Sequence, residues 1–509
     1  MTIDRRAFLT ALGVGGAFAL TGSTADGSVR GAVSRPASRA RTHAGARMPT
    51  AGPPDWSALK ARLDGRLLLP ADQGYDVARL GFNELYDGQL PAAVARCTSA
   101  TDVQSCLDAA RGHGVPIAAR SGGHSYLGYS VPDDGLVMDL RPMARIEVHD
   151  DGTVDVGAGA RLIEVYAGLA QAGRLLPGGS CPTVGIGGLT LGGGIGVLTR
   201  KYGLTCDRLV AAEVVTADSR VLTVSECAEP DLYWALRGGG GGNFGVVTRF
   251  TFRTEPAPPL TVFSLRFPAG ATPSVVGAWQ GWIADARPEL WSNCVISGGT
   301  PPTCRVGGCY VGTPDALNPL LDTLIAAVGT RPGTRGVQAK NYLDAMKYMA
   351  GCSTDTIAQC HPTFEGGRLT REAFVAVSRV LTAALDGQAV VGLMAGRVGL
   401  DLLLDSMGGA VAELAPDATA FPHRKALATA QIYANTTPAG QAAATEAVDA
   451  VRDGLAALGA TGAYVNYIDA TLPDWGTAYY AGNLPRLKSV AHHYDPTGVF
   501  TFPRSVANA

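Results

Sequence analysis

Residues Gly185–Gly196 read GIGGLTLGGGIG and place seven glycines in twelve positions. A run this rich in glycine lets successive backbone N–H groups approach one ligand closely. The interleaved isoleucine and leucine side chains indicate burial, which weakens the alternative of a glycine-rich surface loop. The run also lacks the Lys-Ser/Thr pair of a P-loop. We therefore predict a buried backbone cradle for a diphosphate.

A second glycine-rich run, Arg237–Gly245, contains a literal G-x-G-x-x-G. A Rossmann fingerprint follows a strand and opens a helix, because the helix N-terminus holds the pyrophosphate. Here the run is followed by VVTRFTF at Val246–Phe252, a pattern typical of a strand. The Rossmann interpretation therefore fails on context.

Two further glycine-flanked loops carry reactive side chains. Arg120–Ser125 reads RSGGHS and contains His124, and Gly178–Val184 reads GGSCPTV and contains Cys181. Taken alone, His124 is equally consistent with an ordinary surface or core histidine. Cys181 is consistent with a buried thiol, a nucleophile or a covalent attachment point. A cysteine hydrolase built on the two is disfavoured, because no orienting Asn or Asp is evident.

Composition excludes several classes of protein. The 509 residues include 66 glycines, with 42 basic against 44 acidic residues and a net charge of −2. High aliphatic content and low charge exclude a disordered chain, and the length favours two or three domains. No basic run follows the N-terminus, so nucleic acid is not an expected partner. No C-x-x-C or H-x-x-x-H spacing occurs, so no metal site is expected. Ten cysteines permit disulfides, whose pairing the sequence leaves open.

The N-terminal residues have a pattern that differs from the rest of the chain and is typical of a targeting segment. Arg5 and Arg6 precede a short apolar stretch that ends at Leu20, which predicts a twin-arginine signal peptide over residues 1–26. The stretch is too short to span a bilayer, and no cysteine follows it, so we expect no stable membrane anchor. Residues 27–54 are predicted to be a disordered linker. We expect the twin-arginine machinery to export the folded chain to the extracellular or periplasmic/cell-wall space.

Hydrophobic periodicity divides the remaining chain into three parts: about 89–258, a second region from 260 to about 460, and a tail from 463. The first alternates helices and strands and predicts an α/β region, with helices at Thr101–His113 and Leu162–Ala172 and strands at Val115–Ala119, Leu136–Leu140, Val154–Val156 and Leu209–Thr216. The second predicts a sheet covered by helices, with strands at Leu260–Phe267 and Ala389–Gly392 and helices at Ala316–Val328, Arg371–Leu385 and Thr445–Leu458. The tail predicts a strand at Ala463–Asp469 and a helix at Tyr480–Tyr494.

These motifs together resemble the berberine bridge enzyme-like oxidases of the vanillyl-alcohol-oxidase superfamily, over about 80–505. The loops at His124 and Cys181, the VGIGG sequence after the cysteine, and the closing YVNYID at Tyr464–Asp469 carry the resemblance. It implies an α/β (α+β) two-domain flavin oxidase, with a vanillyl-alcohol-oxidase-type FAD-binding domain (80–258) and a substrate domain built on an antiparallel sheet covered by helices (259–462). The tail (463–506) would complete the active site.

The resemblance also implies a cofactor and the residues that hold it. FAD would be bound bicovalently, with His124 joined to the flavin 8α-methyl and Cys181 to flavin C6. The other expected cofactor-binding residues lie in the glycine loops and the tail: Arg120, Ser121, Gly122, Gly123, Ser125, Gly179, Val184, Gly185, Gly188, Gly192, Gly193, Gly196, Val247, Asn466 and Asn483.

The same resemblance assigns catalytic roles. Tyr467 matches a base that removes a substrate hydroxyl proton while hydride passes to flavin N5. A free tyrosine has a pKa of about 10 and is only about 0.1% ionised near pH 7, so it needs an activating neighbour. Asp405 matches the aspartate that partners this tyrosine in the family's oligosaccharide oxidases. Val184 matches a gatekeeper position where valine leaves room for dioxygen.

The expected function is an FAD-dependent oxidase that dehydrogenates an alcohol, either a carbohydrate or a hydroxyl or sugar of a secondary metabolite, and reduces O2 to H2O2. Alkaloid-cyclising relatives carry a glutamate after their Phe-Pro-His-Arg stretch. Here Phe421–Arg424 leads to Ala430 and Gln431 without a carboxylate, which disfavours ring closure. Oxidative cyclisation or desaturation by the same flavin, and a non-catalytic binding protein, remain the alternatives.

Overall fold

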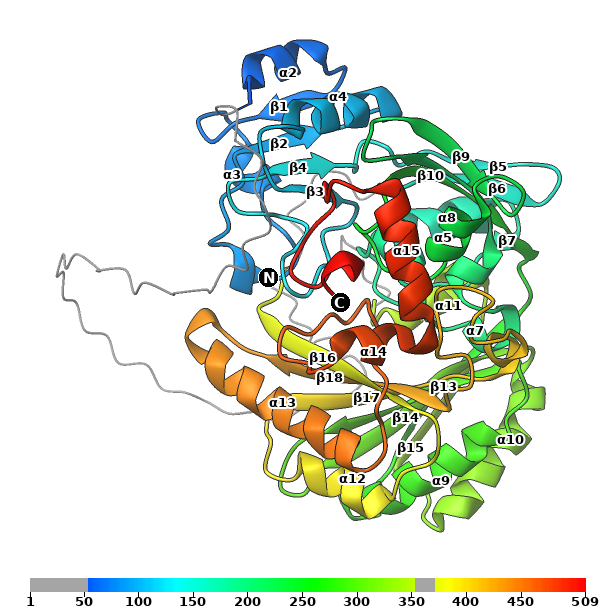
Figure 1. Cartoon of the computed structure of the whole chain (residues 1–509). Coiled ribbons are helices and arrows are strands. Elements are labelled where there is room, and N and C mark those ends of the chain that lie inside the picture. Colours follow the sequence, from blue (N-terminus) through cyan, green and yellow to red (C-terminus); the bar gives the residue numbers. More distant parts are fainter. Residues whose placement is uncertain (1–53, 353–370) are drawn as a thin grey trace.

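The structure is a computed structural model that describes residues 54–352 and 371–509. The N-terminal part, drawn in blue to green at the top of Figure 1, carries two small sheets. A single larger sheet fills the lower part, and the C-terminal helices return to the upper part. The predicted signal peptide and nearly all of the predicted linker lie outside the described residues.

The upper part is built on a four-stranded and a five-stranded sheet. The first has the order β1 (Arg66–Leu68), β2 (Ala93–Arg96), β4 (Leu136–Asp139), β3 (Ile117–Arg120), with β2 and β3 both parallel to β4. The second is antiparallel, with the order β5 (Ile146–Val148), β6 (Thr153–Gly157), β10 (Val246–Arg253), β8 (Leu209–Val215), β9 (Val221–Ser225). The main helices are α4 (Ala100–Ala110), α5 (Leu162–Gln171) and α8 (Pro230–Ala235).

The lower part is one antiparallel sheet of seven strands. Its order is β15 (Thr334–Lys340), β12 (Leu260–Arg266), β14 (Thr303–Val311), β13 (Leu290–Ser297), β17 (Leu400–Ser406), β18 (Ala428–Asn435), β16 (Phe374–Leu381). Helices α9 (Thr272–Ala284), α10 (Pro314–Val328), α12 (Gly387–Met394) and α13 (Gln441–Ala457) cover its outer face (Figure 1). The predicted antiparallel sheet covered by helices is confirmed.

Alternation along β17 shows why this sheet has two different faces. Leu400, Leu402 and Leu404 are almost completely buried in the core between the sheet and its helices. Leu403 and Asp405 point to the opposite face, where they line a cavity. Because side chains of a strand alternate with period two, one residue pattern supplies both the core and the cavity wall.

The C-terminal segment packs against the upper part. It contains α14 (Trp475–Tyr480) and α15 (Leu484–Tyr494), and Leu487, Val490 and Tyr494 join the core that holds the two upper sheets. The last 45 or so residues therefore cross from the lower sheet back to the first half of the chain, as Figure 1 shows in red.

Several predicted elements are wrong. Arg371–Leu385 contains strand β16 instead of a helix. Phe374 and Ala376 pack in one hydrophobic cluster and Val377 packs in another, as expected when side chains alternate between the two faces of a sheet. Ala389–Gly392 lies in helix α12, which begins where the Asp386 side chain accepts a hydrogen bond from Ala389 N. Residues 463–469 form turns instead of a strand. The final helix begins at Leu484 and is preceded by α14.

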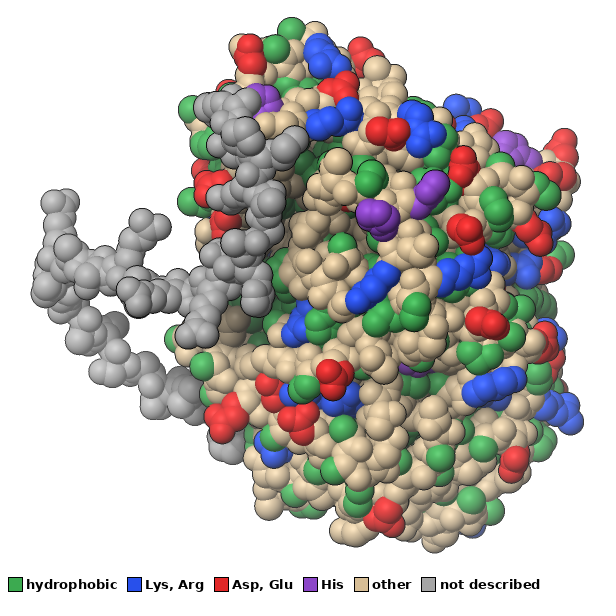
Figure 2. Space-filling view, in the orientation of Figure 1, with side chains coloured by type: hydrophobic (Ala, Val, Ile, Leu, Met, Phe, Trp, Pro, Cys, Tyr) green, Lys and Arg blue, Asp and Glu red, His purple; other side chains and the backbone are tan. Residues whose placement is uncertain are grey.

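Cysteine pairing, helix hydropathy and surface charge complete the description of the fold. Cys352 is disulfide-bonded, whereas Cys294, Cys304 and Cys309 of the same cysteine-rich region are free thiols. Among the described residues, no helix has the length and apolarity needed to cross a membrane. Acidic and basic side chains are interspersed over the face shown in Figure 2, as the near-neutral net charge suggests.

Candidate active site

A cavity of about 440 Å³ lies where the three parts of the chain meet. Its wall combines the glycine loops of the upper part, the inner face of the seven-stranded sheet and the turn before α14. Residues separated by more than 300 positions in the sequence therefore face one space, among them His124, Cys181, Asp405 and Tyr467. Ligand sites are commonly found in such concave junctions between domains.

The glycine loops touch each other through their backbones. A side chain on Gly122 would overlap with the backbone N of Gly185, and a side chain on Gly185 would overlap with the backbone N of Gly122. Gly188 has no atom within 4 Å of the position where a Cβ would lie, and it lines the cavity. The loops thus form a bare, closely packed wall, and this fits the predicted cradle for a dinucleotide.

His124 is oriented by two neighbours. Its ring stacks on Phe82 with centroids 3.8 Å apart and planes 17° apart. Its Nε2 lies 2.9 Å from Thr183 Oγ1. Thr183 is two residues from Cys181, so a direct hydrogen bond joins the loop of His124 to the loop of Cys181.

Cys181 is half-buried and lines the same cavity as His124. Its loop is held from behind by Tyr166, whose hydroxyl donates a 2.5 Å hydrogen bond to Gly179 O. The two predicted attachment residues therefore stand on neighbouring, supported loops at one cavity wall.

Tyr467 stands at the cavity within a group of tyrosines. Its ring lies parallel to Tyr126, with centroids 5.3 Å apart and planes 6° apart, and nearly perpendicular to Tyr464 at 5.1 Å. Burial raises the pKa of Tyr467 well above the ordinary value, and the neighbouring Tyr126 and Asp405 raise it further. Tyr467 is therefore a neutral phenol near pH 7.

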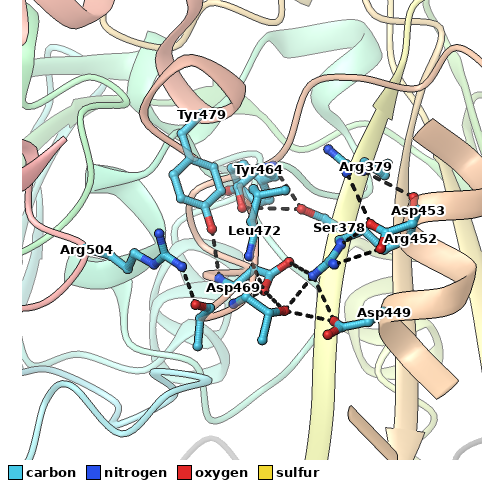
Figure 3. Close-up of polar contacts among 12 residues, drawn as sticks. Ser378, Arg379, Asp449, Arg452, Asp453, Tyr464, Asp469, Leu472, Tyr479 and Arg504 are labelled. Carbon is cyan, nitrogen blue, oxygen red and sulfur yellow. Dashed lines mark hydrogen bonds and ion pairs between the residues drawn. The ribbon is translucent and has the colours of Figure 1, made fainter. Parts of the chain in front are cut away.

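The turn that carries Tyr467 is fixed on both sides. On one side, the Tyr464 hydroxyl accepts hydrogen bonds from Gly194 N and from Asn466 Nδ2, at 3.0 and 2.8 Å. On the other side, Figure 3 shows Asp469 at the centre of a polar cluster. Asp469 is 2% exposed and accepts a 2.9 Å hydrogen bond from Arg452 Nη1 of α13.

The sheet supplies the opposite wall. Asp405 of β17 pairs in register with Asn293 of β13 and with Thr429 of β18. Gln431 lies two residues further along β18, and its Nε2 donates a 2.5 Å hydrogen bond to the Tyr126 hydroxyl. Tyr126 thus contacts Tyr467 through its ring and Gln431 through its hydroxyl.

Most predicted cofactor-binding residues line this cavity: Ser121, Gly122, Gly123, His124, Ser125, Gly179, Cys181, Val184, Gly185, Gly188, Gly196, Val247 and Asn466. Four lie outside its wall. Arg120 is 3.2 Å from Asp139 in a buried ion pair, and Asn483 donates to Pro416 O. Gly192 and Gly193 leave room for Asn466 and Phe421. These four therefore contact neighbouring protein segments instead of the cavity.

Sequence reasoning missed several cavity residues. Tyr126 follows His124 by two positions, and this proximity in the sequence is a signal from which its place at the cavity could have been predicted. Asn293, Arg305 and Gln431 come from strands without any motif, and only the order of strands in the sheet brings them to the cavity.

Two known protein families match the parts of the chain that carry the glycine loops and the C-terminal turn. The FAD binding domain family matches residues 91–225, and the family described as berberine and berberine like matches residues 463–507. The chain is also 34% identical over 455 residues to the FAD-linked oxidoreductase YgaK of Bacillus subtilis, covering 88% of this chain and 98% of that one. The chain belongs to the berberine bridge enzyme-like family.

Other members of this family confirm the fold. Glucooligosaccharide oxidase of Sarocladium strictum is 32% identical and covers 84% of this chain and 89% of its own. The solved structure of Physcomitrella patens BBE-like 1 superposes with a TM-score of 0.83 at 29% identity, covering 89% of this chain and 99% of that one. A solved glucooligosaccharide oxidase, described as carrying a 6-S-cysteinyl, 8α-N1-histidyl FAD, has a TM-score of 0.80 at 29% identity over 89% and 99% of the two chains.

Family membership makes the chain an FAD-linked oxidoreductase. The predicted family, fold class, enzyme class and FAD cofactor are thereby confirmed. The match over residues 91–225 contains His124 and Cys181, and the match over 463–507 contains Tyr467, so both matched regions contribute to the cavity.

Proposed function

We propose that this chain is an exported oxidase that dehydrogenates an alcohol, a carbohydrate or a hydroxyl of a secondary metabolite, with FAD attached through both His124 and Cys181. The observation that carries the proposal is the meeting of His124, Cys181, Tyr467 and Asp405 at one cavity. The sugar-oxidising relatives support the substrate class, because the chain covers most of their length.

The residues present fit a flavin held at this wall. Two bare glycine loops provide backbone contact, and a histidine and a cysteine on adjoining loops provide two attachment points. Double attachment would keep the ring in place while leaving the rest of the cavity open to a bulky substrate. When bound, the flavin supplies a two-electron acceptor that takes a hydride from the alcohol carbon and passes both electrons to O2, which gains two protons to become H2O2.

Tyr467 and Asp405 would manage the substrate proton. Tyr467 is a neutral phenol, so it does not act as a preformed phenolate. We assign Asp405 as the group that accepts the Tyr467 proton while Tyr467 takes the proton of the substrate hydroxyl. Loss of that proton and of the hydride from the adjacent carbon leaves a carbonyl product.

The reaction type can be tested by oxygen stoichiometry. The purified full-length chain is assayed with a panel of mono- and disaccharides in an oxygen electrode, and H2O2 is measured with a peroxidase-coupled dye. We expect one O2 consumed and one H2O2 formed for each carbonyl product. Product formation that needs an added electron acceptor and consumes no O2 would contradict the oxidase assignment.

Export can be tested separately. Replacing the paired arginines, Arg5→Lys together with Arg6→Lys, should retain the folded, yellow protein inside the producing cell, because the paired arginines identify a twin-arginine signal. Unchanged secretion of the double variant would contradict this route.

A further inference from the structure

Arg305 of β14 is a buried cation at the cavity wall, and its side chain has no hydrogen-bond or ion-pair partner among residues 54–352 and 371–509. It is 9% exposed and lines the cavity. Five other arginines of the described residues are equally buried: Arg120, Arg200, Arg379, Arg424 and Arg452. Each of those five donates hydrogen bonds to backbone carbonyls or carboxylates. The Arg305 guanidinium, by contrast, makes no such hydrogen bond and no ion pair within the described parts of the chain.

A buried unpaired charge is unfavourable unless something compensates it. Burial, together with the charge of Arg266 directly opposite on β12, lowers the pKa of Arg305 to about 10. At pH 7 the guanidinium is still charged. The carboxylate of Asp401 raises the pKa of Arg305, but it does not form an ion pair with the guanidinium. The cavity therefore holds a cation whose counter-charge the described residues do not supply.

Asn293 provides a second unsatisfied group beside Arg305. Its side-chain Oδ1 is buried without a hydrogen-bond partner, and the residue is 9% exposed at the cavity wall. Gly307 lies between the two: a Cβ added there would be 3.2 Å from Asn293 Oδ1 and 3.4 Å from Arg305 Nη1. The Arg305 and Asn293 side chains therefore close over Gly307 and form one polar patch in which a cation lies beside an amide oxygen.

This patch lies away from the reacting end of the cavity. Gly307 pairs with Asn293, and Asn293 pairs with Asp405, so Gly307 and Asp405 are two strands apart in one row of the sheet. With about 4.8 Å between neighbouring strands, the patch is roughly 10 Å from Asp405. That separation is close to the length of a disaccharide. The carboxylate of Glu372 lies at the other end of the sheet, beside Tyr433 next to β16.

We propose that Arg305 and Asn293 form a recognition site for a carboxylate on the substrate, so that this oxidase acts on anionic hydroxylated molecules of disaccharide size such as uronic-acid-containing oligosaccharides. The planar guanidinium matches a carboxylate through two parallel hydrogen bonds. Asn293 Oδ1 accepts from a hydroxyl next to that carboxylate, a combination that a sugar acid presents. The proposal rests on the proposed function, because the oxidised hydroxyl is placed at Tyr467.

The test compares two disaccharides that differ in one group: cellobiose and β-D-glucuronosyl-(1→4)-D-glucose. Their binding to the holoenzyme is measured by calorimetry in a Tyr467→Phe background, where oxidation is slow. We expect the anionic sugar to bind at least about tenfold more tightly, which is the effect of one charge-assisted hydrogen bond of about 1.4 kcal/mol. Arg305→Gln should remove this preference while changing cellobiose binding less than about twofold.

Two further variants serve as controls. Arg335→Gln, on the edge strand β15 of the same sheet, removes an arginine that pairs with Asp322 at the surface, and it should leave both affinities unchanged. Arg305→Lys keeps the charge but not the fork, and should restore part of the preference. Thermal unfolding of Arg305→Gln shows whether the fold survives, which we expect because removing an unpaired buried charge costs little.

Equal affinity of the parent protein for both sugars, or a preference that persists in Arg305→Gln, would overturn the proposal. Oxygen consumption by the wild-type chain with the same sugars reports on the proposed function separately. Selective binding of the anionic sugar without oxidation of either sugar counts against the oxidase function and leaves the carboxylate site standing. Oxidation of both sugars with equal affinity supports the oxidase function and overturns the carboxylate site.

Discussion

Tyr467 is a buried neutral phenol in the position of a catalytic base. Burial and the neighbouring Asp405 raise its pKa, whereas the proposed reaction requires it to accept a proton from the substrate. The conflict disappears if its own proton moves to Asp405 in the same step. This arrangement makes the hydroxyl of Tyr467 necessary and the aromatic ring alone insufficient.

Tyr467→Phe should keep the ring stacked on Tyr126 but lose the proton-transfer group. We expect the rate of flavin reduction by substrate to fall by about 10²- to 10⁴-fold, the usual contribution of general acid–base catalysis. Anaerobic stopped-flow absorbance of the flavin measures it. A reduction rate equal to that of the unmodified protein would remove Tyr467 from the catalytic role.

Thr183 orients His124 through the bond from Thr183 Oγ1 to His124 Nε2. Thr183→Val should slow attachment of flavin to His124 and leave attachment to Cys181 intact, because the hydrogen bond that fixes the ring is lost. Peptide mass spectrometry gives the fraction attached at each site. Thr190→Val is the matched control, since the Thr190 hydroxyl is buried without a hydrogen-bond partner in the described structure. Complete histidyl attachment in Thr183→Val would refute this role.

At the scale of an element, the turn at 463–469 depends on a buried ion pair with helix α13. Arg452 bonds both Asp469, which is buried, and Asp453, whose side chain is 61% exposed. Asp469→Asn should lower the free energy of unfolding by about 2 kcal/mol, because it removes the buried charge-assisted hydrogen bond to Arg452 and leaves that guanidinium only its more exposed partners Asp449 and Asp453. Asp453→Asn should cost less than about 1 kcal/mol.

Urea denaturation of the two variants measures this difference. Asp469→Asn should also slow flavin reduction, because the turn carries Tyr467, whereas Asp453→Asn should not. Equal losses of stability in both variants would show that burial of the pair is not what holds the turn.

His423 gives the protein a pH-dependent stability. Burial lowers its pKa from 6.5 to about 4, so the unfolded chain binds this proton at a higher pH than the folded chain. The stabilisation is therefore complete above about pH 6.5 and is lost as pH falls toward 4. We expect a loss of about 2 kcal/mol over this interval.

Unfolding free energies at pH 7 and pH 4.5 measure the effect. The decrease should be smaller by this amount in His423→Gln, which cannot be protonated. A decrease of the same size in both proteins would assign the acid sensitivity to other groups.

Local patterns predicted elements well where tertiary context agreed with them. Helix α4 and strands β4, β6 and β8 follow their periodicity closely. The valine-rich stretch of β16 was misassigned because its helical and strand periodicities are similar over a short run, and pairing with β18 decides between them. The YVNYID stretch alternates like a strand, but Tyr464 and Asp469 are held by contacts to distant segments that no local pattern contains.

At the scale of the whole molecule, the cavity arises from the return of the C-terminal segment to the first half of the chain. His124, Cys181 and Tyr467 could be found from sequence because they lie in motifs that resemble a family. Arg305 and Asn293 could not, because β14 and β13 look like ordinary strands. Their importance follows from which face of the sheet meets the glycine loops, and long-range strand order determines that.

We propose that the two loops at this cavity hold one flavin by two covalent bonds. The most direct measurement is acid precipitation of the purified protein, followed by proteolysis and mass spectrometry of the flavin-containing fragments. We expect the yellow colour to precipitate with the chain, and a single flavin to join the peptide containing His124 to the peptide containing Cys181. Release of all flavin into the acid supernatant would contradict it.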